Sequence, residues 1–142
     1  METIKLSFEA RSDSNDLVLT IRFNDQILTA INPGSNFAAY EFDLSDELPN
    51  QVLEFDLAGK TNAHTQIDSN GNIVKDCVVE IKNVMLDEID ITQLFMEKSV
   101  YKHNFNGNSD NINDSFFGTM GCNGTVRFEF TSPFYVWLLE NM

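Results

Sequence analysis

The feature that most constrains this chain is a repeated alternation of apolar and polar side chains in short segments. A period of two residues is typical of β-strands that bury one face and expose the other. The apolar positions of the five clearest segments are Ile4, Leu6, Phe8, Leu17, Leu19, Ile21, Phe23, Tyr40, Phe42, Leu44, Leu53, Phe55, Leu57, Val126, Phe128 and Phe130. Because charged residues occupy the positions between them, the pattern predicts antiparallel sheets with one face in water.

Turn-forming pairs separate these segments. Asn24-Asp25 predicts a hairpin between strands at 17–23 and 26–31. Asn70-Gly71 predicts a second hairpin, between about 64–68 and 73–85, and Asn123-Gly124 predicts a third before a strand at 125–131. Asp87-Glu88 is expected to turn 84–86 back into 89–91. With about ten strands, the sequence predicts a single all-β domain over residues 1–142, an antiparallel β-sandwich resembling a jelly roll.

Three segments depart from the alternating pattern. Thr92–Lys98 (TQLFMEK) predicts one short helix near 92–98 with Thr92 as its cap. Asn104–Ser115 is polar and rich in asparagine, which predicts one long surface loop. Ser132–Leu139 is apolar on both faces if it is a strand, so it is either a central, covered strand or a strand whose outer face meets another subunit.

Charge and composition exclude several classes of partner. The 142 residues carry a formal net charge of -13, which disfavours nucleic acid and anionic membranes and favours cations. The longest apolar run, Phe134–Leu139, is far shorter than the ~20 residues that span a bilayer. No secretory signal is visible at the start, so synthesis in a cytoplasm is expected. Cys77 and Cys122 are either reduced core thiols or one pair.

Catalytic motifs are missing from the sequence. His64 and His103 lack the spacing of a metal pair, and there is no G-x-S-x-G, P-loop or G-x-G-x-x-G. A pair of carboxylates among the 22 acidic residues could serve a glycoside hydrolase. That pattern is not specific, so the sequence favours a protein that binds or assembles over an enzyme.

A cation site is one candidate function. Four residues with oxygen ligands gather around a single predicted turn, namely Asp68, Asn70, Asn72 and Asp76. Carboxylate, amide and carbonyl oxygens are what Ca²⁺ prefers. The alternative is a polar hairpin turn whose asparagines and glycine adopt positive φ. A second cation candidate is the asparagine-rich loop with Asn106, Asn108, Asp110, Asn113 and Asp114.

Sugar binding is the other candidate. It needs aromatic rings that stack on sugars beside polar groups that bond hydroxyls. The sequence offers Tyr101, Tyr135 and Trp137 as rings and Asn106, Asn108 and Asp110 as polar partners. Phe105, Phe116 and Phe117 lie near the same loop, although phenylalanine at strand ends more often belongs to a core.

Two stretches resemble known proteins. Val78–Ile91 (VVEIKNVMLDEIDI) resembles a strand pair of small β-sandwich carbohydrate-binding modules, with Asp87-Glu88 where those modules have Asp-Gly. That resemblance implies non-catalytic sugar binding, often with calcium. Asp114–Met142, together with Gly59-Lys60-Thr61 and Asp68–Asp76, resembles small uncharacterised proteins of large marine tailed bacteriophages. That resemblance implies a virion role, in a tail fibre, a baseplate or a capsid surface.

Three functional hypotheses follow. The first is a non-catalytic virion module that assembles with itself or another virion protein through the apolar outer face of its last strand. The second is a calcium-dependent carbohydrate-binding module whose partner is a glycan. The third is a small hydrolase with paired carboxylates, which requires a cleft with two acids and at least one raised pKa.

Overall fold

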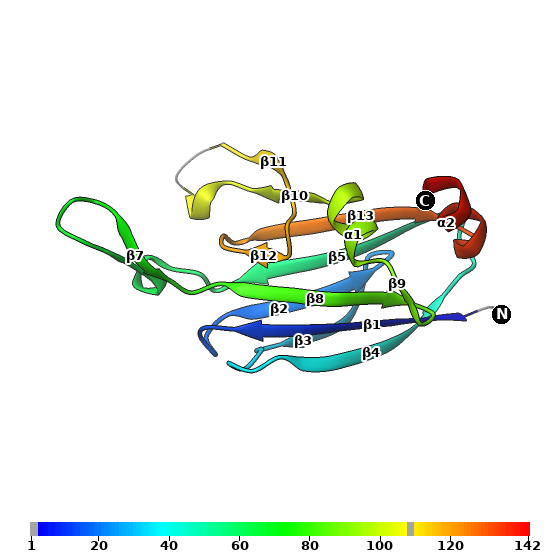
Figure 1. The fold of residues 1–142 in the computed structure, drawn as a ribbon, viewed down its shortest axis with the longest axis horizontal. Coiled ribbons are helices and arrows are strands. Elements are labelled where there is room, and N and C mark those ends of the chain that lie inside the picture. The colour runs from blue at the N-terminus through cyan, green and yellow to red at the C-terminus, as the bar shows by residue number, and fades with distance from the viewer. Residues whose placement is uncertain (1–2, 108–109) are drawn as a thin grey trace.

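The computed structural model describes residues 3–107 and 110–142, and they form two antiparallel sheets packed face to face (Figure 1). The first sheet has the strand order β12-β8-β1-β4, with β9 paired to β8. Its strands are β1 (Thr3–Ser12), β4 (Ala38–Ser45), β8 (Val79–Leu86), β9 (Ile89–Asp90) and β12 (Thr119–Met120). The all-β antiparallel sandwich that the alternation predicts is therefore confirmed.

The second sheet is wider, with the strand order β11-β10-β13-β5-β2-β3. Its strands are β2 (Val18–Phe23), β3 (Gln26–Ile31), β5 (Asn50–Ala58), β10 (Val100–His103), β11 (Ile112–Ser115) and β13 (Gly124–Thr131). Alternate residues of β5 and β13 are buried between the two sheets, and the residues between them face away from the core. The outer face of this six-stranded sheet is therefore polar.

The core between the sheets is aromatic. Phe55 packs edge-on against Phe8 of the first sheet, at 5.1 Å between ring centroids, and edge-on against Phe95 at 5.6 Å. Phe95 also packs against Phe116 and Phe128. Edge-to-face pairs of this kind add about 0.5–1.5 kcal/mol each beyond the area that they bury. The alternating phenylalanines thus link both layers into one core.

The predicted hairpins at Asn24-Asp25 and Asp87-Glu88 are confirmed. Both residues of each pair have positive φ, as a two-residue turn of this type requires. The hairpin at Asn70-Gly71 is also present, between β6 (Thr65–Ile67) and β7 (Ile73–Asp76). It projects beyond both sheets at one end of the sandwich (Figure 1). The predicted strand 73–85 is wrong in its extent, because Cys77 and Val78 separate β7 from β8.

The predicted short helix is confirmed as α1 (Thr92–Lys98). Its capping differs from the prediction. Ile91 is the N-cap residue, and the Thr92 hydroxyl instead accepts the N–H of Val84 at 2.9 Å. The carboxylate of Asp90 accepts the N–H of Thr92 at 2.9 Å, so an acidic side chain satisfies one of the free donors of the first turn. Phe95 fixes the helix to the core.

The predicted last strand is wrong. Residues Phe134–Asn141 form a helix, α2, which buries Phe134, Trp137 and Leu138 on one side. The spacing of these three matches helical neighbours, and a strand cannot bury them together. The buried carboxylate of Asp46 accepts the N–H of Phe134 at 3.1 Å, which satisfies a donor at the helix start. The outer strand face predicted to drive assembly therefore does not exist.

Two further expectations need correction. The segment Asn104–Ser115 is not one loop, because β11 (Ile112–Ser115) pairs with β10 along the sheet edge. Asn123-Gly124 does not close a hairpin, because β12 pairs with β8 in one sheet while β13 pairs with β5 and β10 in the other. Two short 3-10 turns, at Asn62–His64 and Phe105–Gly107, complete the described elements. Among the described residues, no helix has the length and apolarity to cross a membrane.

Candidate functional site

The outer face of the six-stranded sheet carries a depression of about 410 Å³. Its lining comes from β5, β10, β11 and β13 and consists of Glu54, Val100, Lys102, Asn113, Thr125 and Arg127. Strand alternation places them there, because each lies next to an inward-facing position of its own strand and opposite an outward-facing residue of the neighbouring strand. The depression therefore combines five polar side chains with one apolar one.

Strand register arranges these side chains in two parallel rows. One row runs from Val100 on β10 to Arg127 on β13, Glu54 on β5 and Arg22 on β2. The second row runs from Asn113 on β11 through Lys102, Thr125 and Asp56 to Thr20, one strand position after another. Neighbouring strands lie about 4.8 Å apart, so successive side chains of each row are separated by about that distance.

Ion pairs hold the first row in place. A terminal nitrogen of Arg127 lies 3.7 Å from Glu54, and the other lies 2.8 Å from Glu129. The Nε of Arg22 lies 3.6 Å from Glu54. The hydrogen bond to Glu129 raises the pKa of Arg127. Exposed pairs of this kind contribute at most about 1 kcal/mol to stability, so their main effect is to fix the orientation of these planar groups.

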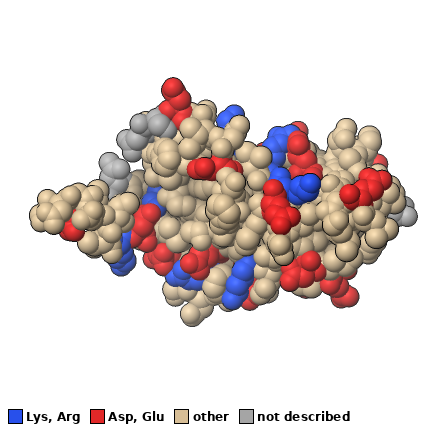
Figure 2. All heavy atoms as spheres, turned by 45° about the horizontal axis from the view of Figure 1, so that its top comes forward, with Lys and Arg blue, Asp and Glu red and all other residues tan. Residues whose placement is uncertain are grey.

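The second row contains an unpaired cation. The hydroxyl of Thr125 donates to Asp56 at 2.6 Å, whereas Lys102 makes no ion pair with any described residue. Basic side chains are few in this acidic protein, and Figure 2 shows them as small groups among acidic residues. Lys102 is therefore an exposed donor that internal contacts leave available.

The four predicted calcium ligands do not come together. At the hairpin tip, the Asp68 carboxylate accepts the N–H groups of Asn70 and Asn72, each at 2.9 Å. At the hairpin base, Asp76 accepts the ammonium of Lys60 at 2.6 Å. About three residues of strand separate the two acids along the hairpin, which is roughly 10 Å. In the part of the chain that the structure describes, no group of three His, Cys, Asp or Glu side chains could hold a metal ion.

These contacts do not fit a calcium site in the hairpin. A calcium ion takes six to eight oxygens and is bound through carboxylates that face it. One candidate carboxylate here is engaged by backbone donors and the other by a lysine ammonium. The residues that sequence reasoning selected therefore form a stable turn and an ion pair, and the clustering in sequence reflects a tight hairpin.

The asparagine-rich loop lies at the same end of the sandwich as the projecting hairpin (Figure 1). Hydrogen bonds connect the loop to the β12–β13 connection and to the segment after β5. Asn106 accepts the N–H of Asn123 at 2.7 Å, and Asn123 in turn accepts the N–H of Lys60 at 2.8 Å. Asp110 is exposed, and Asn108 lies outside the described residues. Asn106 thus has a structural role in joining the loop to its neighbours.

The three predicted aromatic platforms are divided between the two ends of the molecule. Tyr101 is 6% exposed and its hydroxyl donates to the carbonyl of Cys122, so its ring has no free face. Burial raises the pKa of that hydroxyl. Trp137 is 8% exposed and lies in α2, at the opposite end of the sandwich. Tyr135 of the same helix is half-exposed, and its hydroxyl donates to Asp87. Buried rings cannot stack on a sugar, and Tyr135 lies far from the asparagine-rich loop.

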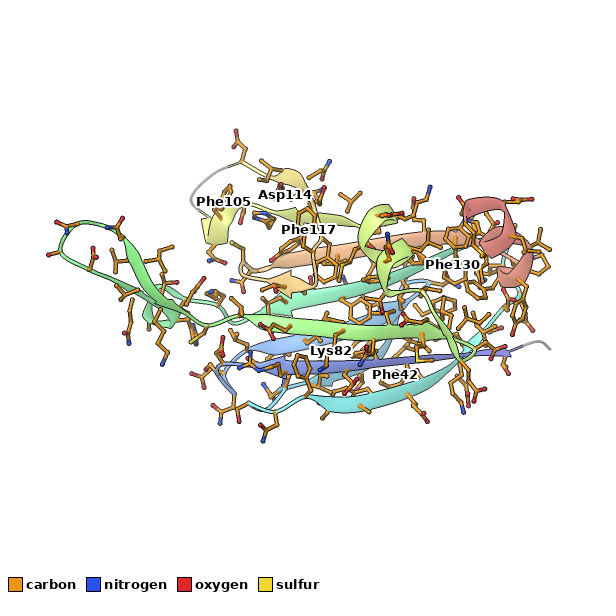
Figure 3. All side chains as sticks on the ribbon, viewed as in Figure 1. Phe42, Lys82, Phe105, Asp114, Phe117 and Phe130 are labelled. Atoms are coloured by element: carbon orange, nitrogen blue, oxygen red, sulfur yellow. The ribbon has the colours of Figure 1, made fainter. Side chains whose placement is uncertain are left out.

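Adjacent phenylalanines on the β11–β12 connection behave oppositely. Phe116 is buried in the core, whereas Phe117 is 79% exposed. Figure 3 labels Phe117 on the connection that follows β11. His103 lies with its Nε2 2.9 Å from Asp114 and its ring against Phe105. Phe117 is therefore an exposed aromatic ring that the sequence does not separate from core phenylalanines.

The carboxyl groups with shifted pKa values give no support to a hydrolase. Burial tends to raise the pKa of Asp13, but hydrogen bonds from Arg11 and Val78 lower it overall. Hydrogen bonds from Thr92 lower the pKa of Asp90. A general acid needs a raised pKa, so neither group is suited to that role.

Comparisons with known proteins identify similar folds. No protein-family model matches the sequence, and no curated protein matches it. A structure of vCBM60 in complex with galactobiose is similar, with a TM-score of 0.53 and 12% identity over 87% of this chain and 96% of that chain. A selenomethionine form of vCBM60, described in connection with two families of calcium-dependent carbohydrate binding modules, has a TM-score of 0.52 and 12% identity over 88% and 89% of the two chains.

At this level of identity, the likeness shows a shared β-sandwich fold. It agrees with the resemblance to carbohydrate-binding modules. It gives no support to the resemblance to bacteriophage proteins, or to assembly within a virion.

Proposed function

We propose that this protein is a non-catalytic module that binds a neutral glycan across the outer face of its six-stranded sheet. The observation that carries the proposal is the depression formed by two rows of fixed polar side chains around Val100. The fold it shares with carbohydrate-binding modules supports the same function.

The chemistry of the rows suits sugar hydroxyls. Guanidinium, carboxylate and amide groups each offer two hydrogen-bonding atoms in one plane, so one group can bond two adjacent hydroxyls. Arg127, Glu54 and Asn113 supply one group of each kind. The ion pair between Arg127 and Glu54 fixes these two groups before binding, which lowers the entropy that binding would otherwise cost.

Charge selects the class of glycan. The protein has a net charge of -13. On this face of the sheet the carboxylates Glu54, Asp56 and Glu129 lie beside the cations Arg22, Lys102 and Arg127, so the face itself carries no excess of positive charge. A polysaccharide rich in carboxylate or sulfate groups would be repelled by the net charge of the whole protein. A neutral oligosaccharide that extends across several strands meets no such penalty.

The experiment is a screen of the purified protein against arrayed neutral and anionic oligosaccharides, followed by calorimetric titration of the strongest neutral ligand. Arg127→Ala should weaken binding by roughly 10- to 150-fold, since hydrogen bonds to charged groups contribute about 1.5–3 kcal/mol. Asn113→Ala and Lys102→Ala should weaken binding as well.

A matched control lies on the other sheet. Arg11 is also an ion-paired surface arginine, bonded to Asp13 and Glu80. Arg11→Ala should leave the affinity unchanged. Equal losses in Arg11→Ala and Arg127→Ala would contradict the proposed surface, and the absence of any glycan ligand would contradict the function.

A further inference from the structure

Lys60 is a buried cation in an acidic protein, and its side chain is 1% exposed. Its Nζ lies 2.6 Å from the Asp76 carboxylate, 2.6 Å from the carbonyl of Cys77 and 2.8 Å from the carbonyl of Gly121. An ammonium group has three donors, so all three are satisfied by oxygen. The positive charge of Lys60 and the negative charge of Asp76 cancel within this cage.

The cage joins three segments that are distant in sequence. Lys60 follows β5, Asp76 and Cys77 lie at the base of the projecting hairpin, and Gly121 lies between β12 and β13. Asn123 strengthens the junction, because it accepts the N–H of Lys60 and donates to its carbonyl at 3.0 Å. A two-stranded hairpin has marginal stability alone, so this junction is what anchors β6 and β7 to the sandwich.

A carboxylate and two backbone carbonyls are oxygen ligands of the kind that a bound calcium ion uses to tie loops together. Here the ammonium of Lys60 occupies the place among those oxygens that a metal ion would otherwise take. We infer that Lys60 is a built-in cation that holds this end of the fold together in place of a free metal ion. Order of the hairpin, and the stability that this junction gives to the fold, therefore do not depend on a bound calcium ion. This inference does not rest on glycan binding.

The first test uses the unmodified protein. Its melting temperature and its rate of tryptic cleavage after Lys75, on β7, should be unchanged by excess EDTA or by millimolar calcium chloride. A fall in melting temperature or faster cleavage with EDTA, reversed by calcium, would overturn the inference.

The second test removes the cation. Lys60→Ala leaves two carbonyls without their donor and removes the cation that pairs with Asp76, which keeps the hydrogen bond from the Thr65 hydroxyl. The melting temperature should therefore fall by roughly 10 °C or more. Cleavage after Lys75 should accelerate at least several-fold. Lys98→Ala removes an exposed lysine of α1 and should change neither quantity. A Lys60→Ala protein that matches Lys98→Ala would contradict the inference.

Chemical rescue separates lost charge from lost packing. Propylammonium replaces the atoms that Lys60→Ala removes, whereas propan-1-ol has the same length without the charge. Propylammonium should restore part of the melting temperature and slow the cleavage, and propan-1-ol should not. Equal effects of the two additives would contradict a role for the charge. If Lys60→Ala does not fold, Asp76→Asn tests the same ion pair and should also lower the melting temperature.

Discussion

Replacement of Trp137 by alanine is the sharpest test of the C-terminal helix. Trp137 is 8% exposed and lies at one end of the aromatic core. Its ring packs edge-on against Phe128 at 5.5 Å between centroids and lies 6.0 Å from Phe130 and 6.3 Å from Phe134. Three ring contacts and near-complete burial make it, with Phe134, an anchor of α2.

The magnitude follows from these contacts. Truncation of a buried tryptophan to alanine costs about 3–5 kcal/mol. The upper half of that range is expected, because edge-on aromatic pairs are lost together with the buried area. At roughly 3 °C per kcal/mol for a domain of this size, the melting temperature should fall by about 12–15 °C.

The assay is urea unfolding followed by far-ultraviolet circular dichroism, since the variant lacks the chain's single tryptophan. Leu139→Ala is the matched control on the same helix, because Leu139 is 76% exposed. It should change the free energy of unfolding by no more than about 0.5 kcal/mol. Equal effects of the two variants would refute the packing of α2 against the core.

Three further predictions concern other parts of the fold. Gly124→Ala should destabilise the protein by about 1–3 kcal/mol in thermal unfolding, because a Cβ at this position would meet the carbonyl of Lys102. An unchanged free energy of unfolding would contradict the packing of β10 on β13. Burial raises the pKa of Cys122, so a thiol reagent should react with it slowly in the folded state at neutral pH and rapidly after unfolding, and equal rates would count against its burial. The pKa of Asp90 is lowered from 3.8 by its hydrogen bonds to Thr92. The ionised Asp90 carboxylate therefore stabilises the fold above about pH 3.8, and this stability is lost as the pH falls through the lower pKa of the folded state. Asp90→Asn should flatten the acid limb of the curve of stability against pH. An unchanged acid limb would speak against the hydrogen bonds between Asp90 and Thr92.

The sequence correctly predicts the strands, turns and helix whose structure depends on residues close together in the chain. Alternation identified the sheet strands because one face of each strand is buried and the other is solvated. Asn24-Asp25 and Asp87-Glu88 identified turns because both residues of each pair must adopt positive φ. Thr92–Lys98 was identified as a helix with the observed bounds.

The errors arose where tertiary contacts decide the structure. The segment 134–139 is apolar at nearly every position, so its pattern does not distinguish a two-sided strand from a helix. The distant carboxylate of Asp46 and the core surface beneath Trp137 favour the helix, and neither is visible in the local sequence. Asn123-Gly124 has the composition of a hairpin turn but connects strands of different sheets.

The candidate site was visible in part. The charged positions of β5 and β13, including Glu54 and Arg127, were recognised as a solvated face. Their alignment with Lys102 and Asn113 depends on strand order, which sequence alone does not provide. The role of Lys60 is not visible in the sequence, since the oxygens around its ammonium come from segments up to 61 residues away.

The most direct test of glycan binding at the six-stranded sheet is a nuclear magnetic resonance titration with the strongest neutral oligosaccharide. The account predicts amide shift changes that concentrate on β5, β10, β11 and β13, around Val100 and Arg127, with little change at the hairpin of β6 and β7 or at α2. Shift changes centred on the hairpin, on the asparagine-rich loop or on α2 would contradict it.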